Sequence, residues 1–294
     1  MIPFLVADRP ISLSIIKGIA LPPEGSIGIM SQATTTTDRF KSLFRGYPNS
    51  VAVMYPNGQP PDTQIKRQTI KMVDSGVFGK DGCKISYEEL FCEYEGMGAE
   101  FGIIIDVLRN SKATIASAKE AMRQYQEKLW SFKLVGVAQG ETIAEYLRCY
   151  DCLLRMGYQY IAIGGLLQKR ENTARYVYIR SSDLMEDVLR AVRERFKPLW
   201  LFVLGAFHPS RLPIFQEYCV WGSDYKGWLF NYAKKDEVLA AIRDGTIGRH
   251  RRVGLKEIQE QEVQKLSEQE LRFLLTRVFI ERCVLPFVRR NGNG

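Results

Sequence analysis

The sequence predicts an α/β fold, and specifically a single TIM-type (β/α)8 barrel. Its second half repeats one unit, a short apolar run followed by a loop of small residues and then a helical stretch. The apolar runs are continuous, which is typical of parallel strands that are buried on both faces. About eight such runs in 294 residues suit one barrel. A doubly wound open sheet has the same local pattern and remains an alternative.

The second half of the chain contains the clearest strands and helices. Lys133–Ala138 and Tyr160–Ile163 are apolar runs that end at Gln139-Gly140 and Gly164-Gly165. A helix is expected from the first of these loops to about Met156, with Ile143, Leu147, Tyr150 and Leu154 as its apolar stripe. Another helix is expected over 183–196. Two further strands are predicted at 199–204 and 218–221.

The first half is less regular but compatible with the same fold. Strands are predicted at 27–30, 51–54, 70–73 and 101–105, and a helix is predicted at 113–129. Ser267 and Glu270 form a capping-box pattern in a C-terminal helical segment, 257–290, that we expect to continue past Phe279. No linker rich in Pro, Gly or Ser divides the chain, so residues 1–294 are expected to form one domain.

Composition favours a soluble protein without a bound metal. No apolar run approaches the roughly 20 residues of a membrane helix, and no secretory signal is recognisable, so the expected location is the cytoplasm. The six cysteines are expected to be free thiols. Cys149 and Cys152 form a C-x-x-C inside a helical pattern, with no second pair or nearby His to complete a zinc set. The sequence predicts neither a metal nor a cofactor.

The formal charge is +8, and one basic run accounts for much of it. The segment 245–256 has no acidic residue and contains Arg249, Arg251, Arg252 and Lys256. Such a run is either a solvated loop or a stripe that contacts phosphates. We take these four residues as the candidate nucleic-acid contacts.

Polar residues and glycines collect where the predicted strands end. The strand ends carry Asp74, Asp106, Gln139, Gly164, Gly165, Gly205 and Asp224. Asp and Gly are common in any loop, and each alone has an ordinary structural explanation. In a parallel barrel, however, the carboxyl ends of all strands meet at one face, where active sites form. The sequence therefore predicts an active site at this face.

Four segments at these strand ends resemble the tRNA-guanine transglycosylase superfamily. Met72–Phe78 (MVDSGVF) resembles the D-S-G-G-F motif, and Gly136–Gly140 (GVAQG) resembles G-[IV]-[VA]-Q-G. Tyr160–Leu166 (YIAIGGL) is similar to A-I-G-G-L, and Val203–Gly205 (VLG) to the strand end L-M-G-V-G. The four follow the order and spacing of the family across about residues 70–230. Each motif alone is weak, but four in order are specific.

The resemblance implies a role for each matching residue. Asp224 would be the nucleophile that attacks C1′ of the sugar, and Asp74 the general acid and base. Asp106 would accept hydrogen bonds from the N1–H and 2-amino edge of a guanine-type base. The remaining substrate-binding positions are Ser75, Gln139, Gly164, Gly165 and Gly205.

The chain departs from the family pattern in two places. The nucleophile segment, usually G-x-D-x-F-D, reads Gly222–Gly227 (GSDYKG) here. One register puts Gly227 at the nucleophile position. The other puts Asp224 there, and we prefer it because no other nearby acid fills the role. The zinc module of tRNA-acting members is also missing, as in the DNA-acting branch, the deoxypurine-in-DNA proteins of bacteria and phages, which the opening Phe4–Pro10 also resembles.

The function expected from this resemblance is replacement of guanine in DNA by a 7-deazaguanine such as 7-cyano-7-deazaguanine. The expected partners are DNA and the incoming base, and a homodimer or an accessory protein stays open. One alternative keeps the enzyme but makes tRNA its substrate. Another is a non-catalytic subunit that binds nucleic acid. A third alternative is an unrelated barrel that binds phosphate or a small molecule at Gly164-Gly165.

Overall fold

The computed structural model describes residues 1–17, 27–34, 36–47, 50–52, 66–76, 84–169, 177–179, 182–225, 235–245 and 258–279. These residues group into two compact units. The first comprises 1–9, 27–49 and 69–225, and the second comprises 10–26, 50–68 and 226–294. The candidate site residues from Asp74 to Asp224 all lie in the first unit.

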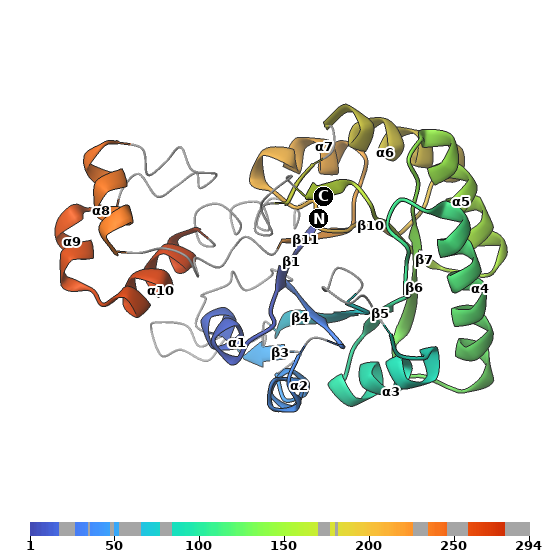
Figure 1. Cartoon of the computed structure of the whole chain (residues 1–294), viewed down its shortest axis with the longest axis horizontal. Coiled ribbons are helices and arrows are strands. Elements are labelled where there is room, and N and C mark those ends of the chain that lie inside the picture. Colours follow the sequence, from blue (N-terminus) through green and yellow to red (C-terminus); the bar gives the residue numbers. More distant parts are fainter. Residues whose placement is uncertain are drawn as a thin grey trace. The chain divides into compact units, whose positions relative to one another are not determined.

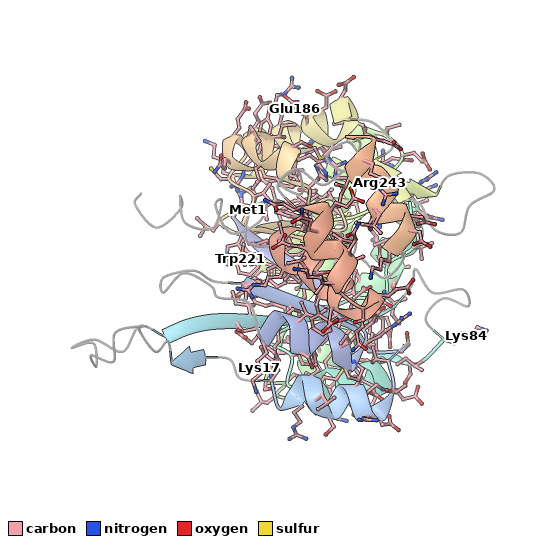
Figure 2. All side chains as sticks on the ribbon, turned by 90° about the vertical axis from the view of Figure 1, so that its left-hand side faces the viewer. Met1, Lys17, Lys84, Glu186, Trp221 and Arg243 are labelled. Atoms are coloured by element: carbon pink, nitrogen blue, oxygen red, sulfur yellow. The ribbon has the colours of Figure 1, made fainter. Side chains whose placement is uncertain are left out.

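The first unit is a closed barrel of eight parallel strands (Figure 1). In barrel order the strands are β1 (Ile2–Val6), β2 (Ile27–Gln32), β4 (Lys66–Asp74), β5 (Phe101–Ile103), β6 (Lys133–Ala138), β7 (Tyr160–Ile163), β10 (Leu201–Val203) and β11 (Gly222–Tyr225). Closure comes from the parallel pairing of β11 with β1, in which Ile2 faces Gly222 and Phe4 faces Asp224. Near this seam lie Met1 and Trp221, both labelled in Figure 2, and the Ile2 N–H donates to the Trp221 carbonyl (2.7 Å).

The pairing registers give the stagger of a TIM barrel. Following the paired residues through all eight strands and back to β4 returns to a residue eight positions before the start. A stagger of eight over eight strands makes the strands tilt and makes alternate strands fill each interior layer. The TIM-barrel prediction is thereby confirmed.

Helices alternate with the strands and cover the barrel on its outside. They are α2 (Asp38–Arg45), α3 (Tyr87–Met97), α4 (Ser111–Glu127), α5 (Ile143–Arg155), α6 (Ser182–Phe196) and α7 (Leu212–Glu217), the last preceded by the 3-10 turn η1 (Pro209–Arg211). Figure 1 shows α3 to α6 side by side around β5, β6 and β7. A short antiparallel hairpin, β8 (Leu167–Lys169) with β9 (Val177–Ile179), follows β7.

Capping explains where several helices begin. Ser86 and Glu89 form a capping box at α3, and Thr142 and Glu145 form another at α5. Asn110 accepts the Ala113 N–H at the start of α4. Each such cap satisfies amide groups that the first helical turn leaves without a partner.

The second unit contains helices and one short strand pair. Its helices are α1 (Pro10–Lys17), α8 (Lys235–Arg243), α9 (Glu260–Lys265) and α10 (Glu268–Phe279). Its strand pair joins β3 (Ser50–Ala52) antiparallel to residues 66–68 of β4. The Ser267 capping box of α10 is confirmed, because the Glu270 N–H donates to Ser267 Oγ and the Ser267 N–H to Glu270 Oε2. Residues beyond Phe279, where this helix was expected to continue, lie outside the described part of the chain.

One strand prediction was wrong, and one predicted strand is not part of the barrel. The strand expected at 218–221 is instead β11, Gly222–Tyr225, because Tyr218 ends α7 and Cys219 has a positive φ of 48°. Val220 is buried, and Trp221 packs against the aromatic rings at the amino-terminal end of the barrel, which explains the apolar residues there. Residues 51 and 52 of the strand expected at 51–54 do form a strand, β3, which lies outside the barrel, and residues 53 and 54 lie outside the described part of the chain. The first barrel strand, β1, was not predicted.

No helix among the described residues is long and apolar enough to cross a membrane.

Candidate active site

The inward-facing residues of the barrel can be identified from its glycines. A Cβ at Gly28 would lie 2.1 Å from the Phe4 ring, and one at Gly222 would lie 3.0 Å from the rings of Phe4 and Phe202, so these positions share the interior. A Cβ at Gly102 would instead meet Tyr94 of α3, and one at Gly136 would meet Tyr158 and then Leu153 of α5, on the outside. Because side chains alternate along a strand, the neighbours of Gly102 and Gly136 face inward.

Aromatic rings fill the amino-terminal end of the barrel. They belong to Phe4, Phe101, Tyr160, Trp200, Phe202 and Trp221, with centroids of contacting pairs 5.0–6.4 Å apart. The Lys133 ammonium lies 5.1 Å from the Phe101 centroid and 5.5 Å from that of Tyr160. This end is therefore packed core, and the polar inward-facing residues lie toward the carboxyl end.

Asp224 and Asp74 occupy successive interior layers near the carboxyl end. Following the register with its stagger, Asp224 shares a layer with Met30, Ile103 and Ala162. The next layer toward the carboxyl end contains Asp74 together with Val6, Val137 and Leu204. Six of the eight side chains in these layers are thus apolar. The two carboxylates enter the interior from β11 and β4, which are separated by β1 and β2.

Asp106, three residues after the end of β5, is held by Gln139. Gln139 Nε2 donates to Asp106 Oδ2, and Gln139 Oε1 accepts the Arg109 N–H (3.0 Å). The Asp106 side chain is buried, and its pKa is raised from 3.8 to about 7, with burial as the largest cause. The negative charge of Asp74 contributes to this rise in pKa, whereas the hydrogen bond from Gln139 opposes it. Asp74 and Asp106 are therefore close enough to influence each other electrostatically, as the strand-end pattern predicts.

Gly164 and Gly165 lie against the Gln139 amide. A Cβ at Gly164 would be 2.5 Å from Gln139 Nε2, and one at Gly165 would be 2.1 Å from Oε1. Gly165 also has a φ of +71°, which favours glycine. The Tyr146 hydroxyl donates to the Gly164 carbonyl (2.8 Å) and fixes this backbone from the α5 side. Only glycine at both positions leaves room for the amide in this orientation.

Asp224 and Gly205 form a second linked pair. Asp224 Oδ1 accepts the Gly205 N–H (2.5 Å), and the Asp224 carbonyl accepts the Phe207 N–H (3.1 Å). Gly205 has a φ of +67°, and the turn that this φ produces directs its N–H at the carboxylate. The loop after β10 is thus tied to the side chain predicted as the nucleophile.

Ser75 connects two strand ends. Its Oγ donates to the Ile104 carbonyl (3.3 Å), and its own carbonyl accepts from Thr34 Oγ1 (2.9 Å). The Ser75 side chain is fully buried, and its hydrogen bond holds the ends of β4 and β5 together.

Sequence reasoning missed two residues that position this site, Arg109 and Tyr146. Arg109 has a φ of +60°, and no local sequence motif predicts this backbone conformation. Tyr146 belongs to the buried stripe of α5, which is Tyr146, Cys149, Tyr150 and Leu153. The predicted stripe was wrong apart from Tyr150, and Leu154 is exposed. A search for aromatic residues one turn into the helix would have found Tyr146.

The predicted site residues from Asp74 to Asp224 are all in the barrel. Arg249, Arg251, Arg252 and Lys256 lie outside the described residues. Within the described ranges, no three His, Cys, Asp or Glu side chains are grouped so that they could hold a metal ion.

Comparisons with known proteins support the fold. No family model matches the sequence, and no curated protein matches it. The structure is similar to that of a fructose-1,6-biphosphate aldolase candidate from Coccidioides immitis, with a TM-score of 0.56 and 11% identity over 99% of this chain and 92% of that one. It is also similar to the YdjI aldolase from Escherichia coli K12, with a TM-score of 0.53 and 13% identity over 99% and 91%. At these identities the likeness shows the TIM-barrel fold alone.

Proposed function

We propose that this protein is a base-exchange transglycosylase that replaces guanine in DNA by a 7-deazaguanine such as 7-cyano-7-deazaguanine. Its motifs resemble those of the tRNA-guanine transglycosylases. The observation that carries the proposal is the placement of Asp74 and Asp224, two carboxylates that enter the barrel interior in successive layers near its carboxyl end. Two carboxylates at one sugar can serve as a nucleophile and as a proton donor and acceptor.

The exchange would take place in two steps. In the first, a carboxylate oxygen of Asp224 bonds to C1′, the bond between C1′ and guanine N9 breaks, and Asp74 donates a proton to the departing base. In the second, Asp74 takes the N9 proton of the incoming base, which bonds to C1′ and displaces the Asp224 oxygen. Two inversions at C1′ give net retention. The Gly205 N–H would hold Asp224 in the orientation for attack.

Base recognition would fall to Asp106 and Gln139. Guanine and its 7-deaza analogues present two adjacent donors, N1–H and the 2-amino group, which suit an ionised carboxylate at Asp106. Gln139 Nε2, oriented by the Arg109 N–H, is a donor for O6. Gly164 and Gly165 bring the backbone close to the Gln139 amide, and a flat base could lie against them.

The direct test is release of labelled guanine from nucleic acid by the purified protein. Duplex DNA and tRNA, each labelled in guanine, would be incubated with 7-cyano-7-deazaguanine. We expect release from DNA with stoichiometric uptake of the deazapurine. Release from tRNA alone would overturn the choice of DNA, and release from neither would overturn base exchange.

Variants of the two carboxylates test the chemistry. Asp74→Asn and Asp224→Asn should each lower exchange by at least about a hundredfold, because each removes a group that forms or breaks a bond. Asp187→Asn, on the exposed surface of α6, is the matched control and should leave exchange unchanged. With the wild type, omission of the incoming base should accumulate a covalent adduct between protein and DNA that Asp224→Asn does not form.

One observation favours a second candidate, a non-catalytic nucleic-acid-binding subunit. Asp224 Oδ1 already has a structural partner in the Gly205 N–H, so holding this loop would by itself account for an Asp at this position. Under this alternative, Asp224→Asn would leave the activity of the partner enzyme unchanged, and the isolated protein would bind DNA without releasing guanine.

A further inference from the structure

The loop between β5 and α4 exposes two apolar side chains directly beside Asp106. Val107 is 40% exposed and Leu108 is 41% exposed. The described residues include six large apolar side chains with such exposure: Leu43, Val107, Leu108, Leu129, Leu154 and Leu199. Of these, only Val107 and Leu108 are adjacent in sequence, and only they follow the carboxyl end of a barrel strand. Single exposed leucines are ordinary, but an exposed pair beside a candidate site requires an explanation.

This loop is fixed by hydrogen bonds on both sides of its tip. Thr114 Oγ1 accepts the Val107 N–H (2.9 Å) and donates to the Val107 carbonyl (3.1 Å). The Asn110 N–H donates to the same carbonyl (3.0 Å), which closes a turn. The Arg109 N–H is held by Gln139 (3.0 Å). Val107 and Leu108 are therefore presented to solvent by an ordered backbone, so little conformational entropy remains to be lost on binding.

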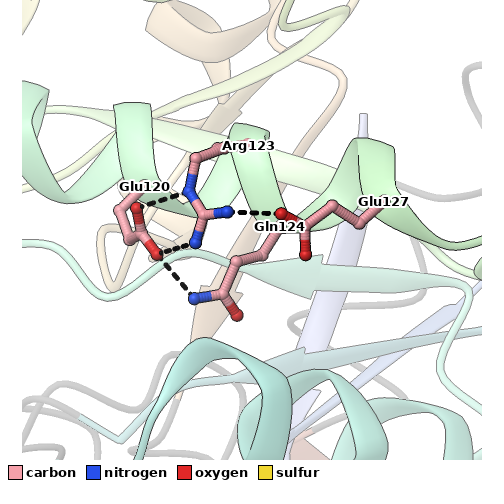
Figure 3. Close-up of polar contacts among 4 residues, drawn as sticks. All are labelled: Glu120, Arg123, Gln124 and Glu127. Carbon is pink, nitrogen blue, oxygen red and sulfur yellow. Dashed lines mark hydrogen bonds and ion pairs between the residues drawn. The ribbon is translucent and has the colours of Figure 1, made fainter.

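Cations flank the apolar tip. Arg109 and Lys112 follow Leu108, and no acidic residue lies between Val107 and Lys112. Across the described ranges neither cation forms an ion pair. By contrast, Arg123, which lies on α4 as Lys112 does, forms ion pairs with Glu120 and Glu127 (Figure 3). Lys112 is near enough to Glu145 to help lower the pKa of that carboxyl, but it forms no ion pair with it. An apolar tip with cations beside it is complementary to a nucleic-acid duplex, whose bases are flat and apolar and whose phosphates are anionic.

We propose that Val107 and Leu108 form a wedge that enters the base stack of duplex DNA next to the nucleotide whose base binds at Asp106. The inference rests on the proposed function, because a base can reach Asp106 only after it leaves the stack. Aliphatic side chains inserted at a base step unstack the neighbouring bases and occupy the space that opens. Arg109 and Lys112 would meet the phosphates beside the extruded nucleotide. Because Asp106 and Val107 are consecutive, capture of the base and filling of the gap would occur together.

The test compares a paired guanine with a guanine that is already outside the stack. Two duplexes would carry one labelled guanine, either paired with cytosine or in a single-nucleotide bulge. The double variant Val107→Ser/Leu108→Ser should lose about tenfold or more of its exchange on the paired guanine, because it cannot hold the gap open. On the bulged guanine it should stay within about twofold of the wild type, because no stack has to be opened. Leu154→Ser, at a position 42% exposed on α5, is the matched control and should change neither rate.

Equal losses on both duplexes, or no loss on either, would overturn the wedge while leaving base exchange standing. If the wild type exchanges neither guanine, the proposed function fails, and a second measurement decides the wedge. That measurement is the fluorescence of 2-aminopurine placed at several positions in a duplex, which rises when the base is unstacked. The wedge requires a rise with the wild type that the double variant does not produce, and it is overturned if both proteins give the same signal.

Discussion

The Asp106 carboxyl group is buried, lies near the negative charge of Asp74 and accepts a hydrogen bond from Gln139. Burial and Asp74 raise its pKa to about 7, so the neutral and ionised forms are both populated near neutral pH. The ionised form is the one that can accept the two donors of a guanine edge. A ligand with that edge would therefore favour ionisation, and its affinity should increase as pH rises through 7.

The same pKa shift predicts how stability depends on pH. The folded pKa of Asp106 lies above its ordinary value of 3.8, so its contribution to stability is complete below pH 3.8 and is lost as pH rises through 7. Asp106→Asn removes this dependence and keeps an acceptor for Gln139. Relative to the variant, the wild type should lose up to about 3 kcal/mol between pH 5 and pH 8, because stability falls by about 1.4 kcal/mol for each of the roughly two pH units between pH 5 and the folded pKa. Urea unfolding at both pH values measures this, with Asp187→Asn as control; a constant difference between wild type and variant would contradict the shift.

Gly165 should tolerate no side chain, for two separable reasons. Its φ of +71° is strained for alanine, and a Cβ would lie 2.1 Å from Gln139 Oε1. Gly157 provides the control, because its φ is +95° and nothing lies within 4 Å of its Cβ position. Gly157→Ala should cost about 1–2 kcal/mol of unfolding free energy from backbone strain alone. Gly165→Ala should cost about 1–3 kcal/mol more, because the amide must move. It should also weaken guanine binding, which calorimetry would detect; equal stability losses would show that the Gln139 contact does not matter.

At the scale of elements, α4 anchors the loop that carries Asp106. Thr114, in the first turn of α4, bonds both the N–H and the carbonyl of Val107. Thr114→Val has nearly the same shape but leaves these groups without that partner, which should cost about 1–3 kcal/mol. Thr114→Ser keeps the hydroxyl and should cost less. Hydrogen exchange at the Val107 amide would report the loop directly, and we expect faster exchange in the valine variant alone.

The elements also show what could be predicted from the sequence. Tyr160–Ile163 and Lys133–Ala138 were predicted with their observed bounds, because each is a continuous apolar run that ends at glycine or at Gln139-Gly140. Strand β11 was misplaced because its inward positions cannot be large and apolar. Gly222 must clear the rings of Phe4 and Phe202, and Asp224 faces the carboxyl end of the barrel. The apolar signal lies instead just upstream, at Val220 and Trp221.

At the scale of the whole molecule, the polar residues at the strand ends predicted which face of the barrel carries the candidate site. They did not predict how the side chains are arranged on that face. Whether Asp74 and Asp224 share a height depends on the stagger accumulated over all eight strands, and no local pattern contains that number. The strand-end pattern also did not predict that the Arg109 N–H orients Gln139. The left-handed backbone conformation of Arg109 is stabilised by tertiary contacts, which the local sequence does not contain. The chemical types at the site were predictable, whereas their relative placement required the closed barrel.

Charge is the remaining property of the whole chain, and its effect on the proposed DNA binding can be separated from that of one segment. A net charge of +8 attracts a polyanion wherever the cations lie, whereas phosphate contacts release counterions only at the sites of contact. Replacing Arg249, Arg251, Arg252 and Lys256 by serine lowers the charge by four. Replacing four exposed cations on the outer helices, Lys119, Arg148, Arg155 and Arg195, lowers it equally.

If the basic segment binds phosphates, the first set should reduce the slope of log affinity against log salt by about one unit per lost contact. The second set should leave that slope unchanged and shift affinity only slightly. Fluorescence anisotropy with a labelled duplex between 50 and 200 mM salt measures both. Equal effects of the two sets would mean that the charge acts through the molecule as a whole, and that the basic segment has no special place in binding.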